Sequence, residues 1–355
     1  MPSRRKFLAG MMAAGMAPRS SWADAGAPDF LTAGQTVDGQ NYLFGLDEAG
    51  AILFRHPIPA RGHAACAHPQ RPEAVAFARR PGRFALVLDC RNGAVLTELS
   101  SPNGRHFYGH GCFSADGDWL FTSENDYEAG QGVIGVWKTD AVYRRVAEFP
   151  SGGIGPHDIR LMPGGDVLVV ANGGIETHPD TGRAKLNLPD MRPNLSYLSR
   201  TGEVLEQVSF DPDRHKNSIR HLDVREDGLV GVALQWQGER HNAPPVLALH
   251  RRGKALRAIG SSRPMHGYGG SVAFSGDGSI VGVSSPRGGR VELYDAASGE
   301  LHRIVKRADI CGLCRRGAGF AASTGAGELL RFGMIGEIGS IASGIRWDNH
   351  LVGIT

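Results

Sequence analysis

Histidine residues recur in this sequence at a regular spacing that could build a metal site. His63, His110 and His157 follow one another at intervals of 47 residues, and the pair Gly62-His63 is repeated as Gly109-His110. When the repeat units described below are aligned on their turns, one position per unit holds the residues His63, His110, His157, His221, Ser271, Cys311 and His350. Neutral imidazoles and thiolates are ligands of first-row transition metals, whereas carboxylates would dominate a calcium or magnesium site. This pattern predicts an iron or copper site whose ligands are His63, His110, His157, His221 and His350, together with Cys311.

A purely structural role for these histidines is the alternative interpretation. A histidine at a fixed position of a repeat can form hydrogen bonds inside its own unit and contact no ligand, and one histidine per unit agrees with either role. Cys311 favours the metal site, because a thiol can replace a metal ligand but not a hydrogen-bonding imidazole. Both interpretations stay open.

The elements that must position these residues are β-strands in a sevenfold repeat. Seven times, an apolar segment, a turn rich in glycine or charge and a second apolar segment follow one another, which is the pattern of a β-hairpin. These hairpins span residues 42–59, 84–102, 134–150, 195–210, 246–259, 291–305 and 328–341. A further β-prone segment precedes each hairpin. In six of the seven units another one precedes that, as from His110 to the turn at Asp116-Gly117.

The two ends of the chain complete one unit. The N-terminal unit has only three strands, and the C-terminus ends in an unaccompanied strand at residues 350–355. Pairing the last strand with the first three removes sheet edges that would otherwise be open. We therefore predict an all-β, seven-bladed β-propeller, closed by pairing the C-terminal strand with the three N-terminal strands, as one domain over residues 24–355.

The predicted fold brings the aligned residues to the mouth of an axial channel. The innermost strand of each blade lines the axis, so equivalent side chains form a ring around it. Loops on the same face would surround this ring, and the candidate cofactor-binding residues in them are Glu124, Asn125, Asn172, His178, Arg220 and Arg287. A ligating histidine usually donates its other N–H to a carboxylate. Glu124, Asp158 or Asp348 could accept it.

One of these loops is unusually long. Residues 174–194 lie between two strands of one blade and explain the wider step from His157 to His221. Insertions of this length in a compact domain are usually functional or disordered. Their position predicts a lid over the channel mouth that carries His178, Arg183 and Lys185.

The first residues have the order of regions of an export signal. Arg4-Arg5-Lys6 is followed by an apolar stretch and then by small residues around Ala23, which predicts a twin-arginine signal peptide over residues 1–23 and a periplasmic protein. The apolar stretch is shorter than the roughly 18 residues of a membrane-spanning helix. We therefore expect no membrane insertion after signal removal.

The charge balance argues against a nucleic-acid partner. The chain carries 39 Lys and Arg against 36 Asp and Glu, and the signal would remove Arg4, Arg5, Lys6 and Arg19, which leaves a balance near zero. Nucleic-acid-binding domains are strongly basic.

Several strings of residues point to a family. Arg61-Gly-His-Ala, Gly109-His-Gly111, Ser218-Ile-Arg-His221 and Arg346-Trp-Asp-Asn-His-Leu351 resemble signatures of the bacterial family catalogued as domain of unknown function 1513. The resemblance extends over nearly the whole chain after the signal. It implies a Tat-exported seven-bladed propeller of the YVTN and lactonase-like kind, associated with iron uptake. Imelysin-like and di-haem oxidoreductase proteins of the same system would be its partners.

Three functional hypotheses follow. The leading one is a periplasmic transition-metal-binding propeller that serves iron acquisition. The second is an enzyme at the same channel mouth, a lactonase-like hydrolase or a metal-dependent oxidoreductase, with His157 as general base, Arg220 or Arg287 as an anion clamp and Glu124 as proton donor. The third is a protein-docking scaffold with a structural ring of histidines.

Overall fold

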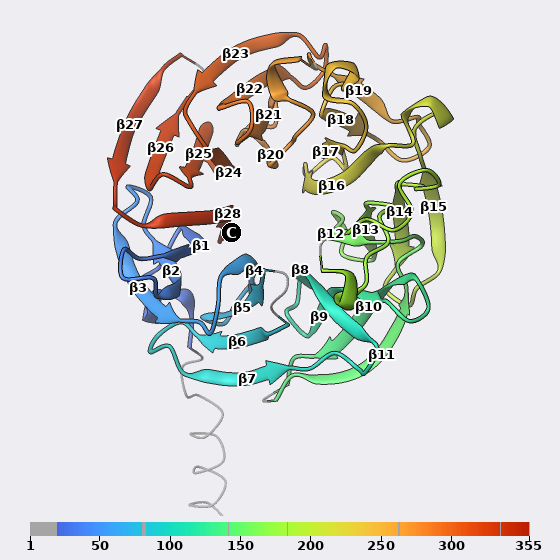
Figure 1. The fold of residues 1–355 in the computed structure, drawn as a ribbon. Coiled ribbons are helices and arrows are strands. Elements are labelled where there is room, and N and C mark those ends of the chain that lie inside the picture. The colour runs from blue at the N-terminus through green and yellow to red at the C-terminus, as the bar shows by residue number, and fades with distance from the viewer. Residues whose placement is uncertain are drawn as a thin grey trace, which may run out of the picture.

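The fold is a ring of seven antiparallel β-sheets around an axis. The structure is a computed structural model that describes residues 20–354 apart from 80–82, 141, 183, 262 and 334. Seven four-stranded sheets follow one another around the axis, as Figure 1 shows from one end. The expected all-β propeller with seven blades is confirmed. Residues 1–19 of the predicted signal peptide lie outside the described residues.

Each blade is named by its innermost strand. From inner to outer strand, the first three blades are β28 (Arg346–Gly353), β1 (Phe30–Gln35), β2 (Asn41–Leu46), β3 (Ile52–Pro57); β4 (Gly62–Ala67), β5 (Glu73–Ala78), β6 (Ala85–Asp89), β7 (Val95–Leu99); and β8 (Arg105–Phe113), β9 (Trp119–Asp126), β10 (Gln131–Lys138), β11 (Arg144–Pro150). The next two are β12 (Pro156–Leu161), β13 (Val167–Asn172), β14 (Asn194–Ser199), β15 (Val204–Val208); and β16 (Asn217–Val224), β17 (Val230–Trp236), β18 (Leu247–His250), β19 (Arg257–Ile259). The last two are β20 (Ser271–Phe274), β21 (Ile280–Ser285), β22 (Arg290–Asp295), β23 (Leu301–Lys306); and β24 (Ile310–Arg316), β25 (Gly319–Thr324), β26 (Glu328–Phe332), β27 (Glu337–Ala342).

Helical structure is confined to short 3₁₀ turns among the described residues. They are η1 (Trp22–Ala25), η2 (Pro179–Thr181), η3 (Pro212–Arg214), η4 (Arg240–Asn242) and η5 (Arg263–Met265). In the described part of the chain no helix has the length and apolar character needed to cross a membrane.

Burial along each blade follows from its neighbours. The middle strand β5 is buried at five consecutive positions, because the adjacent blades cover both of its faces. In the outermost strand β7, three of the five residues are exposed and one is half-buried. Hydrophobic core is therefore distributed between blades, with large buried side chains such as Phe77, Phe121 and Phe274 facing the neighbouring sheets.

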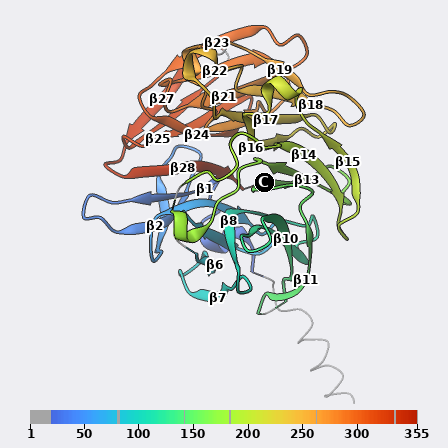
Figure 2. The same cartoon turned by 45° about the vertical axis from the view of Figure 1, so that its right-hand side comes forward.

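The ring is closed by the C-terminal strand. β28 pairs antiparallel with β1, with Leu351 opposite Thr32 and Trp347 opposite Gly34, and Figures 1 and 2 show the two strands side by side. Thr32 adds a hydrogen bond from its hydroxyl to the carbonyl of His350 at 2.8 Å. Trp347 is 2% exposed and packs edge-on against Phe44 at 5.1 Å between ring centroids. The predicted closure is confirmed, and it joins the two ends of the chain into one blade.

Replacing Trp347 by Ala should destabilise the closure. Removing a buried aromatic side chain leaves a cavity and costs about 3–5 kcal/mol. We expect a correspondingly lower urea midpoint for Trp347→Ala. The control Ile338→Ala on the outer strand β27, where the side chain is 59% exposed, should change stability by less than about 0.5 kcal/mol. Equal midpoints for the two variants would contradict a closing role for Trp347.

One histidine outside the ring has a purely structural role. The Nδ1 atom of His68 accepts hydrogen bonds from the backbone N–H groups of Gln70 and Arg71, at 3.1 and 2.9 Å, so Nε2 carries the proton and donates to the carbonyl of Gly117 at 3.1 Å. The side chain is buried, and burial together with the charge of Arg71 lowers its pKa to about 4. His68 is thus held neutral as a turn residue.

Acidification should lower the free energy of unfolding, because the folded protein resists protonation of His68. The unfolded chain takes up a proton on this imidazole near pH 6.5, while the folded protein resists protonation down to about pH 4. The stabilisation is therefore complete above pH 6.5 and is lost as the pH falls toward 4. The drop in unfolding free energy between pH 7 and pH 4.5 should be smaller in His68→Gln by about 2 kcal/mol. His302→Gln, at an exposed position, is the control and should keep the parental pH profile. A parental pH profile in His68→Gln as well would refute this role of His68.

Candidate metal centre

β-Bulges aim the side chains of the inner strands toward the axis. The pairing register shifts between Gly62 and Ala65 in β4, and the same irregularity occurs at ring level in β8, β12, β16, β24 and β28. His157, for example, lies between the paired residues Pro156 and Asp158. A bulge places an extra residue on one strand and re-aims its side chain. Five of the six bulges therefore let a ring residue leave the plane of its own sheet, whereas in β16 the unpaired residue is Arg220 and His221 stays paired with Ala233.

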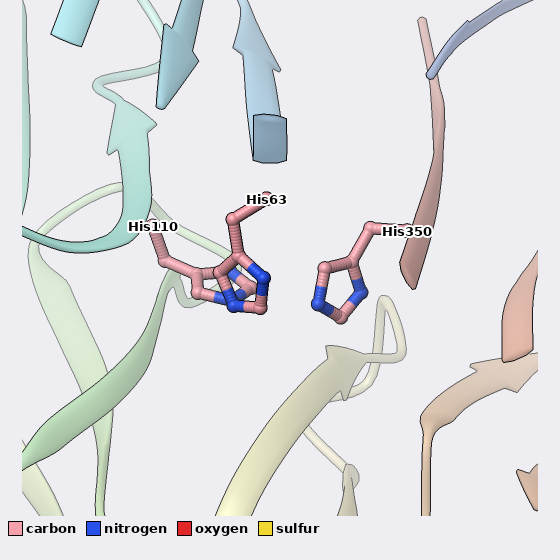
Figure 3. Close-up of side chains that lie close together, drawn as sticks. All are labelled: His63, His110 and His350. Atoms are coloured by element: carbon pink, nitrogen blue, oxygen red, sulfur yellow. The ribbon is translucent and has the colours of Figure 1, made fainter. Parts of the chain in front are cut away.

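Five imidazoles meet on the axis. The ring centroids of His63 and His110 are 4.9 Å apart, and those of His221 and His350 are 4.5 Å apart. His157 completes the set at 4.6 Å from His221. Figure 3 shows the imidazoles of His63, His110 and His350 pointing toward one another from separate strands. We call these five side chains the histidine cluster.

Two overlapping triplets within the cluster have the geometry of ligand sets. One consists of His63, His110 and His350, and the other of His110, His157 and His221. Within each triplet, one nitrogen per ring lies within 4.8 Å of the others. His110 belongs to both triplets, which makes it the centre of the cluster.

The cluster contains buried nitrogen atoms without partners. Within the described part of the chain, Nδ1 of His157, Nδ1 of His221 and Nε2 of His350 are buried and form no hydrogen bond. Burial holds the pKa of all three side chains well below the ordinary value, and the Arg220 guanidinium lowers that of His157 further. These imidazoles are therefore neutral near pH 7 and offer lone pairs to an electrophile. Buried polar atoms are rarely left unsatisfied in proteins.

A carboxylate orients the central histidine. Asp158 Oδ1 lies 3.3 Å from Nδ1 of His110, and Asp158 Oδ2 accepts from the backbone N–H of Leu222 at 3.0 Å. Burial opposes ionisation of Asp158, but the positive charge of Arg160 and the hydrogen bond with His110 hold its pKa below the ordinary value. The ionised carboxylate thus accepts Nδ1–H of His110. Nε2 of His110 is left facing His63 Nε2 at 3.2 Å.

Gly109 makes room for the cluster. Its φ of 101° is a conformation that side-chain-bearing residues avoid, and a Cβ atom there would lie 2.5 Å from the His63 ring. Glycine before His110 is thus required both by the backbone and by the neighbouring imidazole. Gly62, before His63, is required for a different reason, because a Cβ atom there would lie 2.5 Å from the Cβ atom of Ala33.

The structure does not bring the other two aligned residues into the triplets. Ser271 lies beside the cluster, with its hydroxyl 3.4 Å from His350 Nδ1. Cys311 is buried but belongs to neither triplet, and its sulfur faces the backbone of Gly270. Burial raises the pKa of Cys311 to about 12, so its thiol keeps its proton.

Three of the predicted cofactor residues lie inside blades and do not reach the cluster. Glu124 is fully buried, with Oε1 accepting from Arg145 at 2.7 Å and from Thr122 at 2.8 Å. Asn125 donates from Nδ2 to the carbonyl of Thr177 at 3.0 Å. Asn172 exchanges hydrogen bonds with Ser151 at 2.7 and 2.9 Å. All three side chains are held by hydrogen bonds inside the blades or to the long loop, which composition alone does not reveal.

The long loop at residues 174–194 is tied to both neighbouring blades. The bond from Asn125 to Thr177 holds it to the β8 blade, and Lys185 Nζ donates to Gln237 Oε1 of the β16 blade at 2.5 Å. His178 caps η2 and contacts Tyr127 edge-on at 5.0 Å, away from the cluster. Arg183, the third predicted lid residue, lies outside the described residues. The remaining two cofactor candidates, Arg220 and Arg287, line a separate pocket on this face.

A cavity of about 550 Å³ reaches the cluster from the other end of the inner strands. His110, His221 and His350 line its inner end. The acidic side chains along it are Asp29, Glu48, Asp158, Asp223 and Glu226, and the basic ones are Arg160, Arg315 and Arg316. The cluster is therefore reachable from solvent along the axis.

Comparison with known proteins supports the fold. A model of the family described as "Protein of unknown function (DUF1513)" matches residues 56–354. No curated protein matches the chain significantly. The hydrazine synthase of Kuenenia stuttgartiensis is similar in structure, with a TM-score of 0.59, 12% identity and coverage of 86% of this chain and 89% of that chain. The β-propeller domain of Cps50 (Swd1) from Myceliophteria thermophila has a TM-score of 0.59 and 14% identity, covering 96% and 97% of the two chains. At such identities the likeness is one of fold alone.

Proposed function

We propose that this chain, which belongs to the DUF1513 family, binds one transition-metal ion in its histidine cluster. The observation that carries the proposal is the convergence of five imidazoles from five blades, with three buried nitrogens that have no partner among the described residues. Such an arrangement of desolvated donors is unfavourable unless something fills it. A metal ion would satisfy several of these nitrogens at once.

The donor set indicates the class of metal. Neutral imidazole suits iron, copper, zinc and nickel, whereas calcium and magnesium require oxygen ligands. No carboxylate belongs to either triplet. His110 would be a ligand in either case, with His63 and His350 or with His157 and His221. We expect iron or copper.

The arrangement differs from that of histidines with structural roles in the same chain. Both ring nitrogens of His68 are used, Nδ1 in its own turn and Nε2 on the Gly117 carbonyl of the next blade, and the His250 ring is hydrogen-bonded to the Tyr197 hydroxyl at 2.6 Å and the Lys254 carbonyl at 2.8 Å. The cluster imidazoles instead face one another across blades. The enzyme hypothesis has less support, because Glu124, its proton donor, is buried in an ion pair with Arg145.

A proton now occupies a position in the cluster where a metal ion would bind. His63 and His110 share a hydrogen bond between their Nε2 atoms at 3.2 Å, so one proton lies between them. If a metal ion were held by both Nε2 atoms, this proton would have to move to Nδ1 of His63 or to solvent, while Asp158 would keep His110 oriented. The axial cavity with its acidic side chains offers a path for a cation.

For the wider role we propose an accessory protein of iron acquisition in the periplasm. Support comes from the twin-arginine start of the sequence and from the family resemblance. Export in the folded state suits a protein loaded with metal before transport. Imelysin-like and di-haem oxidoreductase proteins would be its partners.

Metal titration of the purified, metal-stripped protein tests the central proposal. Calorimetry with Cu²⁺ and, without oxygen, Fe²⁺ should show about one bound equivalent for at least one metal, and His110→Ala should weaken it about 100-fold or more. His302→Ala, an exposed histidine on β23, should bind as the parent protein does. Failure of both metals to bind stoichiometrically, or equal affinity in His110→Ala, would end the proposal.

Asp158→Asn should weaken metal binding without loss of the fold. The amide can still accept from Leu222 N–H, but it lacks the charge that favours His110 as a ligand. Loss of such a partner typically reduces metal affinity about 10–100-fold. The matched control is Asp166→Asn, an exposed aspartate at the turn between β12 and β13. Parental affinity in folded Asp158→Asn would show that the carboxylate does not orient a ligand.

A further inference from the structure

A second pocket lies on the face that carries the long loop. It has a volume of about 310 Å³ and is lined by the β16 and β20 blades, the connection between them, and the loop. Four of its described lining residues are cationic, namely Lys185, Arg220, Arg240 and Arg287. None of its described lining residues is acidic. A concave site with charges of one sign concentrates ions of the opposite sign.

Two cations of this pocket have no carboxylate partner among the described residues. Neither Lys185 nor Arg287 forms an ion pair with a carboxylate of the described residues, and Lys185 donates instead to the neutral amide of Gln237. Partial desolvation and the charges of Arg220 and Arg287 lower the pKa of Lys185. Three positive charges thus repel one another across a small volume. An anion would relieve this repulsion.

The floor of the pocket is built to hold these groups in place. The Arg287 guanidinium lies over the Tyr268 ring at 4.4 Å, and the backbone of Trp236 donates to the Gly267 carbonyl at 2.9 Å. His266 and Gly267 both have positive φ, of 49° and 64°. A non-glycine residue in this conformation is strained, and such strain is concentrated at functional sites. The neighbouring Met265 is fully buried and anchors the turn.

We propose that this pocket binds a compact oxyanion with at least two negative charges, a small dicarboxylate or a phosphate. Guanidinium groups bind carboxylate and phosphate oxygens through paired N–H donors, and the lysine adds a point charge. The volume admits a small molecule but not a polymer. The site is separate from the metal proposal, since no described residue that lines it belongs to the histidine cluster, although Arg220 directly precedes His221 in β16.

Calorimetry at low salt on metal-stripped protein tests this proposal with sodium succinate, sodium phosphate and sodium acetate. We expect saturable binding of succinate or phosphate, with acetate at least about tenfold weaker, and weaker binding in high salt. Tighter succinate identifies a carboxylate ligand, and tighter phosphate a phosphate ligand. Absence of saturable binding of both dianions, or acetate binding as tightly, would overturn the proposal.

Variants locate the binding site. Arg287→Gln and Lys185→Gln change exposed side chains, so folding should be preserved, and each should weaken dianion binding about tenfold. Arg144→Gln on the outer strand β11 is the matched control and should have no effect. Unchanged affinity in the Arg287→Gln, Lys185→Gln double variant would refute the site. His110→Ala should still bind the anion, so failure of the metal proposal and failure of this one are distinguishable.

Discussion

The pairing of β28 with β1 is the constraint on which the rest of the structure depends. It closes the ring of blades, and it carries His350 to within 4.8 Å of His63, measured between ring centroids, although the two residues lie at opposite ends of the chain. Without closure neither the shared core between blades nor the first histidine triplet exists. The same pairing buries His350, and burial holds the pKa of this imidazole well below its ordinary value, so it stays neutral. Fold stability and the chemistry of the axis therefore rest on one strand.

Two neighbouring sites of opposite chemical character result. The histidine cluster offers neutral nitrogen lone pairs to a cation, while the pocket around Arg220 and Arg287 offers cationic N–H donors to an anion. Arg220, bulged out of β16 directly before His221, stands between them. On the cavity side of the cluster, the carboxylate of Asp158 lies 3.5 Å from the guanidinium of Arg160. The axis thus keeps positive charge near imidazoles that could not coordinate a metal if they were protonated.

Much of this arrangement could be read from the sequence. Turn residues and alternating apolar segments recur in every blade, so the number of blades, the split blade and the five cluster histidines were predictable. The bulges were not, because a register shift at Gly62 or Pro156 depends on how strands pair and leaves no pattern in one strand. The direction of a side chain was not predictable either, as Glu124 and Cys311 show. Both follow the sequence pattern of a site residue, yet Glu124 pairs with Arg145 inside its blade and Cys311 stays outside the triplets.

X-ray absorption spectroscopy of the copper- or iron-loaded protein tests the central claim most directly, because it reports the atoms that surround the metal. The account predicts a first shell of nitrogen with the outer-shell scattering of three or more imidazoles, about 2 Å from the metal, and loss of imidazole scattering in His110→Ala. A shell containing sulfur, a shell of oxygen alone, or an identical spectrum in His110→Ala would contradict it.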